Sequence, residues 1–189
     1  MKSLLIASSL SIVCAAAIAQ PQKPSYAYFE GANLSLGMTQ NSTEETIASA
    51  STTSKTSAGI AKINYTFALA YPGKLGVSAS FDLKNSKVND STYLAATAPT
   101  EITIEPGLLL RNNSLLYAKV GSYASRYEAG ANPSRKLSGT SYGIGIKHYV
   151  YGQNFIQLEW TQRKADDNQA GLGSSIKQTS TAALVGFNF

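Results

Sequence analysis

Apolar and polar side chains alternate along eight separate stretches of this 189-residue chain. A period of two places one kind of side chain on each face of a β-strand. The stretches are residues 32–38, 62–71, 75–83, 93–105, 116–123, 142–150, 156–161 and 181–189. The sequence therefore predicts an all-β protein built from eight strands.

The charged residues within these stretches fall on the polar alternation, while the middle of the apolar alternation carries no charge. Nine charged residues follow the polar alternation or continue it just past the end of a stretch, namely Lys62, Asp82, Lys84, Glu101, Glu105, Lys119, Lys147, Glu159 and Arg163. All of these except Lys84 are expected to lie together on the inner side. A Lys or Arg on the lipid face of a membrane barrel would cost about 2–4 kcal/mol at the bilayer midplane. The segregation of charge therefore favours a closed, antiparallel, eight-stranded transmembrane β-barrel.

The connections between the stretches alternate between long and short. Short polar turns are expected at residues 72–74, 111–114 and 152–154, and long loops at 40–56, 85–91, 128–137 and 164–173. Pro99 predicts a bulge or break within the fourth stretch. A soluble sandwich or a lipocalin-like barrel would show the same alternation, but the connection lengths and the aromatic residues near the stretch ends favour a membrane barrel. Those aromatic residues are Tyr26, Tyr28, Tyr71, Tyr142 and Trp160.

The first 19 residues have the layout of a secretory signal peptide. Lys2 precedes an apolar run, and Ala17-Ile18-Ala19 forms a small-x-small cleavage site. We expect residues 1–19 to be removed and residues 20–189 to form one barrel domain. A transmembrane helix is the alternative reading of the apolar run, and lipidation of Cys14 is another. Cleavage would remove the single cysteine and lower the formal charge from +5 to +4.

A mildly basic exported chain without a basic run or an aromatic RNA-binding motif is not expected to bind nucleic acid. Anionic outer-membrane lipid and lipopolysaccharide are the expected partners of its charge. No Cys cluster, pair of His residues or Gly-rich phosphate loop predicts a metal or cofactor.

The last strand ends on alternating apolar side chains at the very end of the chain, Val185, Phe187 and Phe189. This ending, together with the Tyr-x-Lys-x-Gly-like pattern of residues 117–121, resembles the small eight-stranded outer-membrane β-barrels of the OmpA membrane domain and OmpX type. The resemblance covers nearly all of residues 20–189. It implies a monomeric protein of the outer membrane of a Gram-negative bacterium. It also implies that barrel assembly machinery reads Val185, Phe187 and Phe189 as an assembly signal.

An eight-stranded barrel is just wide enough to be filled by its inward side chains. Four acids against four bases would then form a salt-bridged plug, because unpaired buried ions cost several kcal/mol each. A narrow ion-conducting path and a specific ligand site are the alternatives for this interior.

We expect no catalytic residues. His148 is the single histidine, and it lacks the His-x-Ser-Asn pattern of outer-membrane lipid A deacylases. A lipid-modifying enzyme is the alternative that His148 leaves open. The function predicted from the sequence is a structural or surface-interaction, adhesion-like role carried by four extracellular loops whose ligand is unknown.

Overall fold

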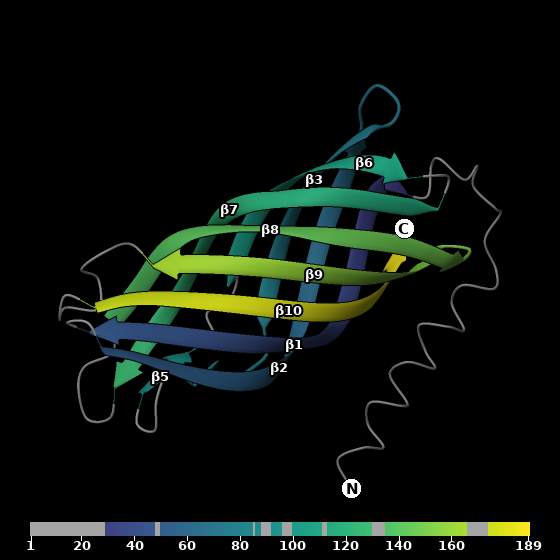
Figure 1. Cartoon of the computed structure of the whole chain (residues 1–189). Coiled ribbons are helices and arrows are strands. Elements are labelled where there is room, and N and C mark those ends of the chain that lie inside the picture. Colours follow the sequence, from purple (N-terminus) through teal and green to yellow (C-terminus); the bar gives the residue numbers. More distant parts are fainter. Residues whose placement is uncertain are drawn as a thin grey trace, which may run out of the picture.

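The computed structural model describes residues 29–47, 50–84, 86–87, 92–95, 100–110, 113–129, 135–165 and 174–189. Eight long antiparallel strands form a closed ring in this part of the chain (Figure 1). They are β1 (Gly31–Ile47), β2 (Ala50–Ala68), β3 (Gly73–Asp82), β6 (Glu101–Leu110), β7 (Ser114–Ala129), β8 (Arg135–Tyr151), β9 (Asn154–Ala165) and β10 (Ser174–Asn188). Each strand pairs with the next along this series, and β10 pairs with β1 to close the ring. The predicted eight-stranded antiparallel barrel is confirmed, whereas the predicted signal peptide lies outside the described residues.

The two ends of the barrel differ in their connections. At one end, which we call the turn end, residues 69–72 join β2 to β3 and residues 152–153 join β8 to β9. The first residue of β1 and the last residue of β10 also lie at the turn end (Figure 1). Short turns face the periplasm in outer-membrane barrels. The opposite end, which we call the loop end, therefore faces outward.

The predicted fourth stretch is divided into two strands. Its first part is the short β5 (Thr92–Ala95), which pairs with β4 (Ser86–Lys87), and its second part is β6. Ala95 pairs with Arg126 of β7, and Glu101 pairs with Tyr123 of the same strand. Six positions separate Ala95 from Glu101, whereas only three separate Tyr123 from Arg126, so this stretch holds more residues than the segment of β7 that it faces. The break expected at Pro99 falls in this interval, although Pro99 itself lies outside the described residues.

The predicted first loop, residues 40–56, is wrong. These residues continue β1 and β2 as a paired hairpin, with Ser42 opposite Lys55 and Ile47 opposite Ala50. Asn41 and Thr43 are fully buried on the inner side of this extension. Polar Ser and Thr residues occupy both faces of this hairpin, so the sequence shows no apolar alternation that would indicate strands. The strands form nevertheless, because Thr favours extended backbone and because pairing satisfies the hydrogen bonds of the peptide groups.

The apolar alternation faces outward and the polar alternation faces the barrel interior. Phe67 and Ile144 are 48% and 58% exposed, whereas Lys62 and Glu101 are 1% and 2% exposed. A soluble barrel or sandwich would bury the apolar set instead. The outer surface is therefore built to contact lipid.

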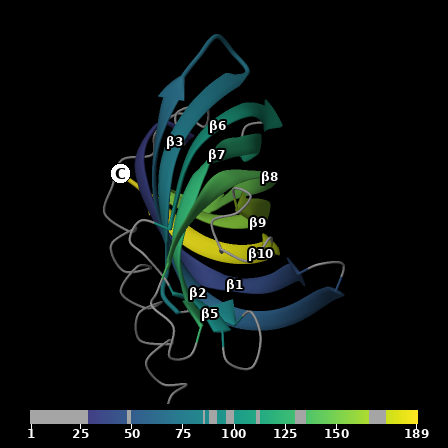
Figure 2. The ribbon, with the colours of Figure 1, turned by 90° about the vertical axis from the view of Figure 1, so that its left-hand side faces the viewer.

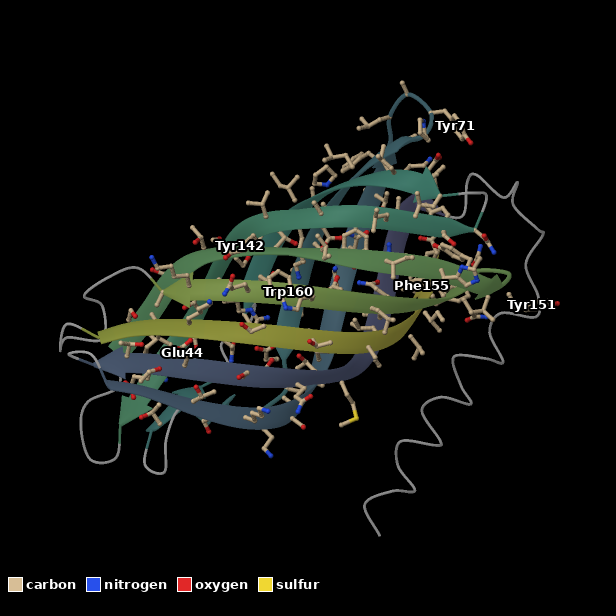
Figure 3. The ribbon with its side chains drawn as sticks, in the orientation of Figure 1. Glu44, Tyr71, Tyr142, Tyr151, Phe155 and Trp160 are labelled. Carbon is tan, nitrogen blue, oxygen red and sulfur yellow. The ribbon has the colours of Figure 1, made fainter. Side chains whose placement is uncertain are left out.

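Aromatic residues mark the two edges of the apolar belt. Tyr142 and Trp160 contact each other with ring centroids 6.4 Å apart, and Tyr71 and Tyr151 are exposed at the turn end (Figure 3). Tyr142 and Tyr151 are nine residues apart on β8, about 30 Å along the strand, or about 23 Å across a membrane at a tilt of roughly 40°. This height matches the apolar band of outer-membrane barrels. Tyr26 and Tyr28, two of the aromatic residues predicted to lie near the ends of the strands, are outside the described residues.

The described part of the chain contains no helix with the length and apolar character needed to span a membrane.

Candidate functional site

The interior of the barrel carries the eight charged residues that the sequence singled out. Lys62 comes from β2, Asp82 from β3, and Glu101 and Glu105 from β6. Lys119 comes from β7, Lys147 from β8, and Glu159 and Arg163 from β9. All of these side chains point into the ring because their strands keep the alternation that the sequence shows.

Seven of the eight charges form one continuous series of ion pairs, which we call the charge ladder. The nitrogen of Lys62 lies 2.6 Å from Glu105 and also contacts Glu159. Lys119 Nζ lies 3.3 Å from Glu159 Oε2 and 2.9 Å from Glu101 Oε1. The other end of the ladder is carried by Arg163, whose Nε lies 2.8 Å from Glu101 and whose Nη1 lies 3.0 Å from Asp82. Acids and bases therefore alternate along the lumen from Glu105 to Asp82.

Neutral hydrogen-bond donors complete the coordination of two ladder acids. Glu159 accepts hydrogen bonds from Tyr117 Oη at 2.5 Å and from Gln157 Nε2 at 2.7 Å. Glu105 accepts from Asn64 Nδ2 at 3.0 Å and from Ser78 Oγ at 2.7 Å. A buried carboxylate keeps its charge at low cost only when its oxygens are paired in this way.

Lys147 is the predicted interior charge that does not join the ladder. Among the described residues it forms no ion pair; its ammonium group donates to Asn33 Oδ1 at 3.2 Å. The same group lies 4.5 Å from the centre of the Phe155 ring, in a cation–π contact. The ladder contains four acids and three bases, and Lys147 offsets the remaining negative charge without contacting any of the four acids.

An apolar cluster lies at the turn end of the lumen, and the sequence alone predicts only its tyrosines as interior residues. Its members are Phe29, Leu109, Leu115, Tyr117, Tyr149 and Phe155. The rings of Phe29 and Tyr149 meet edge to face at 4.7 Å, and those of Tyr149 and Phe155 lie 5.5 Å apart. The sequence does contain an indication of this cluster, because large apolar residues interrupt the polar alternation. Phe155 is one of them, and its side chain is 1% exposed. We call these six residues the turn-end cluster.

Two inward glycines make room for interior rings. Gly145 pairs with Tyr117 across β7 and β8, and a Cβ atom at Gly145 would lie 2.2 Å from the Tyr117 hydroxyl oxygen. Gly186 lies beside the Phe155 ring, where a Cβ atom would come within 2.3 Å of Cζ. The absence of side chains at these positions lets Tyr117 and Phe155 lie flat over the neighbouring strand and fill the lumen.

Polar side chains continue the filling toward the loop end. Arg163 Nη1 donates to Gln178 Oε1 at 3.0 Å, and Gln178 Nε2 donates to Thr43 Oγ1 at 3.3 Å. Ser180 Oγ donates to Asn41 Oδ1 at 2.7 Å. Side chains thus cross-link the described wall from the turn end to the hairpin extension.

The three residues of the predicted assembly signal end the closing strand. Phe189 N donates to Ala32 O at 2.8 Å, and the rings of Phe187 and Phe189 lie 5.2 Å apart. Val185 and Phe189 are 40% and 62% exposed on the outer face. Recognition of these residues by assembly machinery stays a prediction.

His148 has a partner that its own sequence neighbourhood did not reveal. Ser114, directly opposite on β7, places its Oγ 2.8 Å from His148 Nδ1. Both residues lie on the outward alternation at the turn end. Among the described residues His148 forms no ion pair with an acidic side chain, and no group of three or more His, Cys, Asp or Glu could hold a metal.

The sequence matches no family model and no curated protein. The fold of this chain is similar to that of several solved structures. The attachment invasion locus protein Ail of Yersinia pestis is 13% identical, with 84% of this chain and 99% of Ail covered at a TM-score of 0.51. Neisserial surface protein A is 11% identical, with 85% of this chain and 100% of that protein covered at a TM-score of 0.51. The likeness to small outer-membrane barrels is thereby confirmed for the fold, and this fold with its apolar outer belt places the protein in an outer membrane.

Proposed function

We propose that this outer-membrane barrel is a non-enzymatic surface-interaction protein whose recognition element is the hairpin extension of β1 and β2. The observation that carries the proposal is the way this hairpin continues past the apolar belt. Trp160 marks the belt on β9 and pairs with Thr181 of β10, which in turn pairs with Gln40 of β1. β1 then runs on to Ile47, about 23 Å further along the strand. Figure 2 shows β1 and β2 projecting from the ring.

The outer half of β2 continues beyond its described ladder with β3. The described ladder of β2 with β3 begins at Ile60 opposite Asp82, and Leu83 N donates to Gly59 O at 2.9 Å, so residues 50–58 share a described ladder only with β1. None of residues 51–57 is buried, whereas β1 keeps buried side chains at Asn41, Thr43 and Glu45. An exposed strand edge can bind an extended segment of a partner through main-chain hydrogen bonds.

The filled lumen supports a surface role over a transport role. The charge ladder and the turn-end cluster occupy the interior with paired or packed side chains. The names of two proteins with this fold are compatible with the proposal, because one is an attachment protein and the other a surface protein. Ail has also been crystallised with the heparin analogue sucrose octasulfate. A sulfated polysaccharide is therefore a reasonable first probe for this chain.

Shortening the hairpin tests the proposal. Ser42 and Lys55 face each other across β1 and β2, so replacing residues 43–54 with Asn-Gly closes the same register by a two-residue turn. We expect cells that display the native protein to bind immobilised heparin or epithelial monolayers above the level of cells without it. The shortened protein should lose most of this binding.

The shortened barrel must also be shown to fold, by resistance to denaturation in detergent before heating. Equal binding by native and shortened proteins, with both at the surface in equal amounts, would contradict the assignment of recognition to this hairpin. No binding by the native protein to either surface would contradict an adhesive role toward these probes.

A further inference from the structure

The segment that leads into the first strand lies inside the turn end of the barrel. We call residues 29–31 the strap; Phe29 and Glu30 precede β1, and Gly31 is its first residue. The Phe29 side chain is 2% exposed and belongs to the turn-end cluster. Its ring meets the ring of Tyr149 on β8 edge to face. A segment outside the sheet thus supplies part of the packed interior.

Gly31 allows the chain to turn from the lumen into the wall. Its φ angle is +96°, in the left-handed region that residues with side chains rarely adopt. A Cβ atom at this position would also lie 3.2 Å from the carbonyl oxygen of Phe189, at the end of β10. The path of the strap therefore depends on a residue without a side chain at position 31.

Glu30 neutralises a lysine that the sequence placed in a turn and that the structure places inside the barrel. Lys74 is on the inward alternation of β3 and is 6% exposed. Its Nζ lies 2.5 Å from Glu30 Oε1, and among the described residues this is the one ion pair that Lys74 forms. A buried ammonium group that loses its partner is strongly destabilising. The charge balance at the turn end thus depends on the strap.

The strap also lies beside the pairing of β1 with β10, which we call the seam. These are the first and last strands of the ring, so no turn or loop joins one directly to the other. At the turn end of the seam, Phe189 N donates to Ala32 O at 2.8 Å, and Asn188 Nδ2 donates to Glu30 O at 2.8 Å. The strap therefore extends the seam beyond its last paired residues and ties it to β3 and β8.

The surface that receives the strap is complete only when the ring is closed. Before the seam forms, β8 is separated from β1 by β2, β3, β6 and β7; once it forms, only β9 and β10 lie between them. Phe29 can therefore reach Tyr149 while Glu30 holds Lys74 only in the closed ring. Ordering the strap earlier would cost conformational entropy without this full set of contacts.

We propose that the strap is a latch, which enters the turn end after β1 has paired with β10 and then holds the seam closed. Contacts that form after the transition state for folding slow unfolding and leave the folding rate unchanged. The latch therefore makes the barrel slow to open. This role belongs to the turn end and is independent of recognition by the hairpin at the loop end.

Folding and unfolding rates of the purified barrel in phosphatidylcholine vesicles, followed by fluorescence after a change of urea concentration, test the latch. We expect Phe29→Ala to unfold about 100-fold faster than the native protein and to fold within about twofold of its rate. Phe155→Ala is the matched control, because Phe155 and Tyr149 are partners within one hairpin. This control should slow folding as well as speed unfolding. Equal slowing of folding by both variants would overturn the proposal.

The ion pair gives a second test, which remains informative if Phe29→Ala fails to fold. Glu30→Gln should unfold about 10-fold faster than native, because it leaves the Lys74 ammonium group buried without its partner. Adding Lys74→Gln should bring the rate back to within about threefold of native, since no interior charge then lacks a partner. Glu44→Gln, on the hairpin extension, should leave both rates unchanged. Unfolding of Glu30→Gln at the native rate, or no recovery in the double variant, would contradict the latch.

Discussion

Replacing Glu159 with Gln should lower the free energy of unfolding by about 3–5 kcal/mol, because it breaks a buried ion pair from one side. The Glu159 carboxylate contacts Lys62 and Lys119 at the centre of the charge ladder. Its loss leaves these two ammonium groups with one acid each, Glu105 and Glu101. The measurement is urea-induced unfolding of the purified barrel in detergent micelles or lipid vesicles.

Glu44→Gln is the matched control for this substitution. Glu44 lies on the hairpin extension, is partly exposed and accepts a hydrogen bond from Ser51. Loss of such an exposed interaction should cost less than about 1 kcal/mol. Glu101→Gln should behave like Glu159→Gln, because Glu101 pairs with both Lys119 and Arg163. Equal stability of all three variants would mean that water reaches the interior charges.

Replacing Phe155 with Ala is expected to cost about 3–5 kcal/mol of unfolding free energy, since it empties the middle of the turn-end cluster. The ring contacts Tyr149, covers Gly186 and accepts the ammonium group of Lys147. The substitution therefore removes packing and the cation–π contact together. Unfolding in urea measures the change.

Leu83→Ala serves as the comparison for Phe155→Ala. Leu83 is 64% exposed just after β3 at the loop end, and its truncation should change stability by about 0.5 kcal/mol or less. A cost for Phe155→Ala as small as that for Leu83→Ala would show that the turn end is not packed as described.

The barrel could be predicted because its two surfaces differ in chemistry. Phe67 and Ile144 must face lipid, whereas Lys62 and Glu101 must face the lumen. Because side chains alternate between the two faces of a strand, this difference assigns every residue of the strand to a face. A slip of one residue would reverse every assignment, so the register is strongly constrained. The interior charges were identified for the same reason, since a charge on the apolar alternation would have faced lipid.

The hairpin extension and the turn-end cluster could not be predicted from the alternation of apolar and polar residues. Residues 40–56 carry polar side chains on both faces, so the alternation that marks a strand is absent. Phe155 and Tyr117 lie on the polar alternation, where only the glycines on neighbouring strands show that the lumen accepts rings. The separation of Lys147 from the ladder and the contact of Ser114 with His148 depend on registers between strands, which one sequence does not specify.

Ion conductance across a planar bilayer tests most directly whether this protein is a closed surface barrel. The ladder from Glu105 to Asp82 and the turn-end cluster fill the described interior, so we expect the purified native protein to insert without producing large, steady single-channel currents. Small or rare openings would fit transient rearrangement of the ladder pairs. Large and steady currents from the native barrel would show an open lumen and would contradict the closed interior on which the surface role rests.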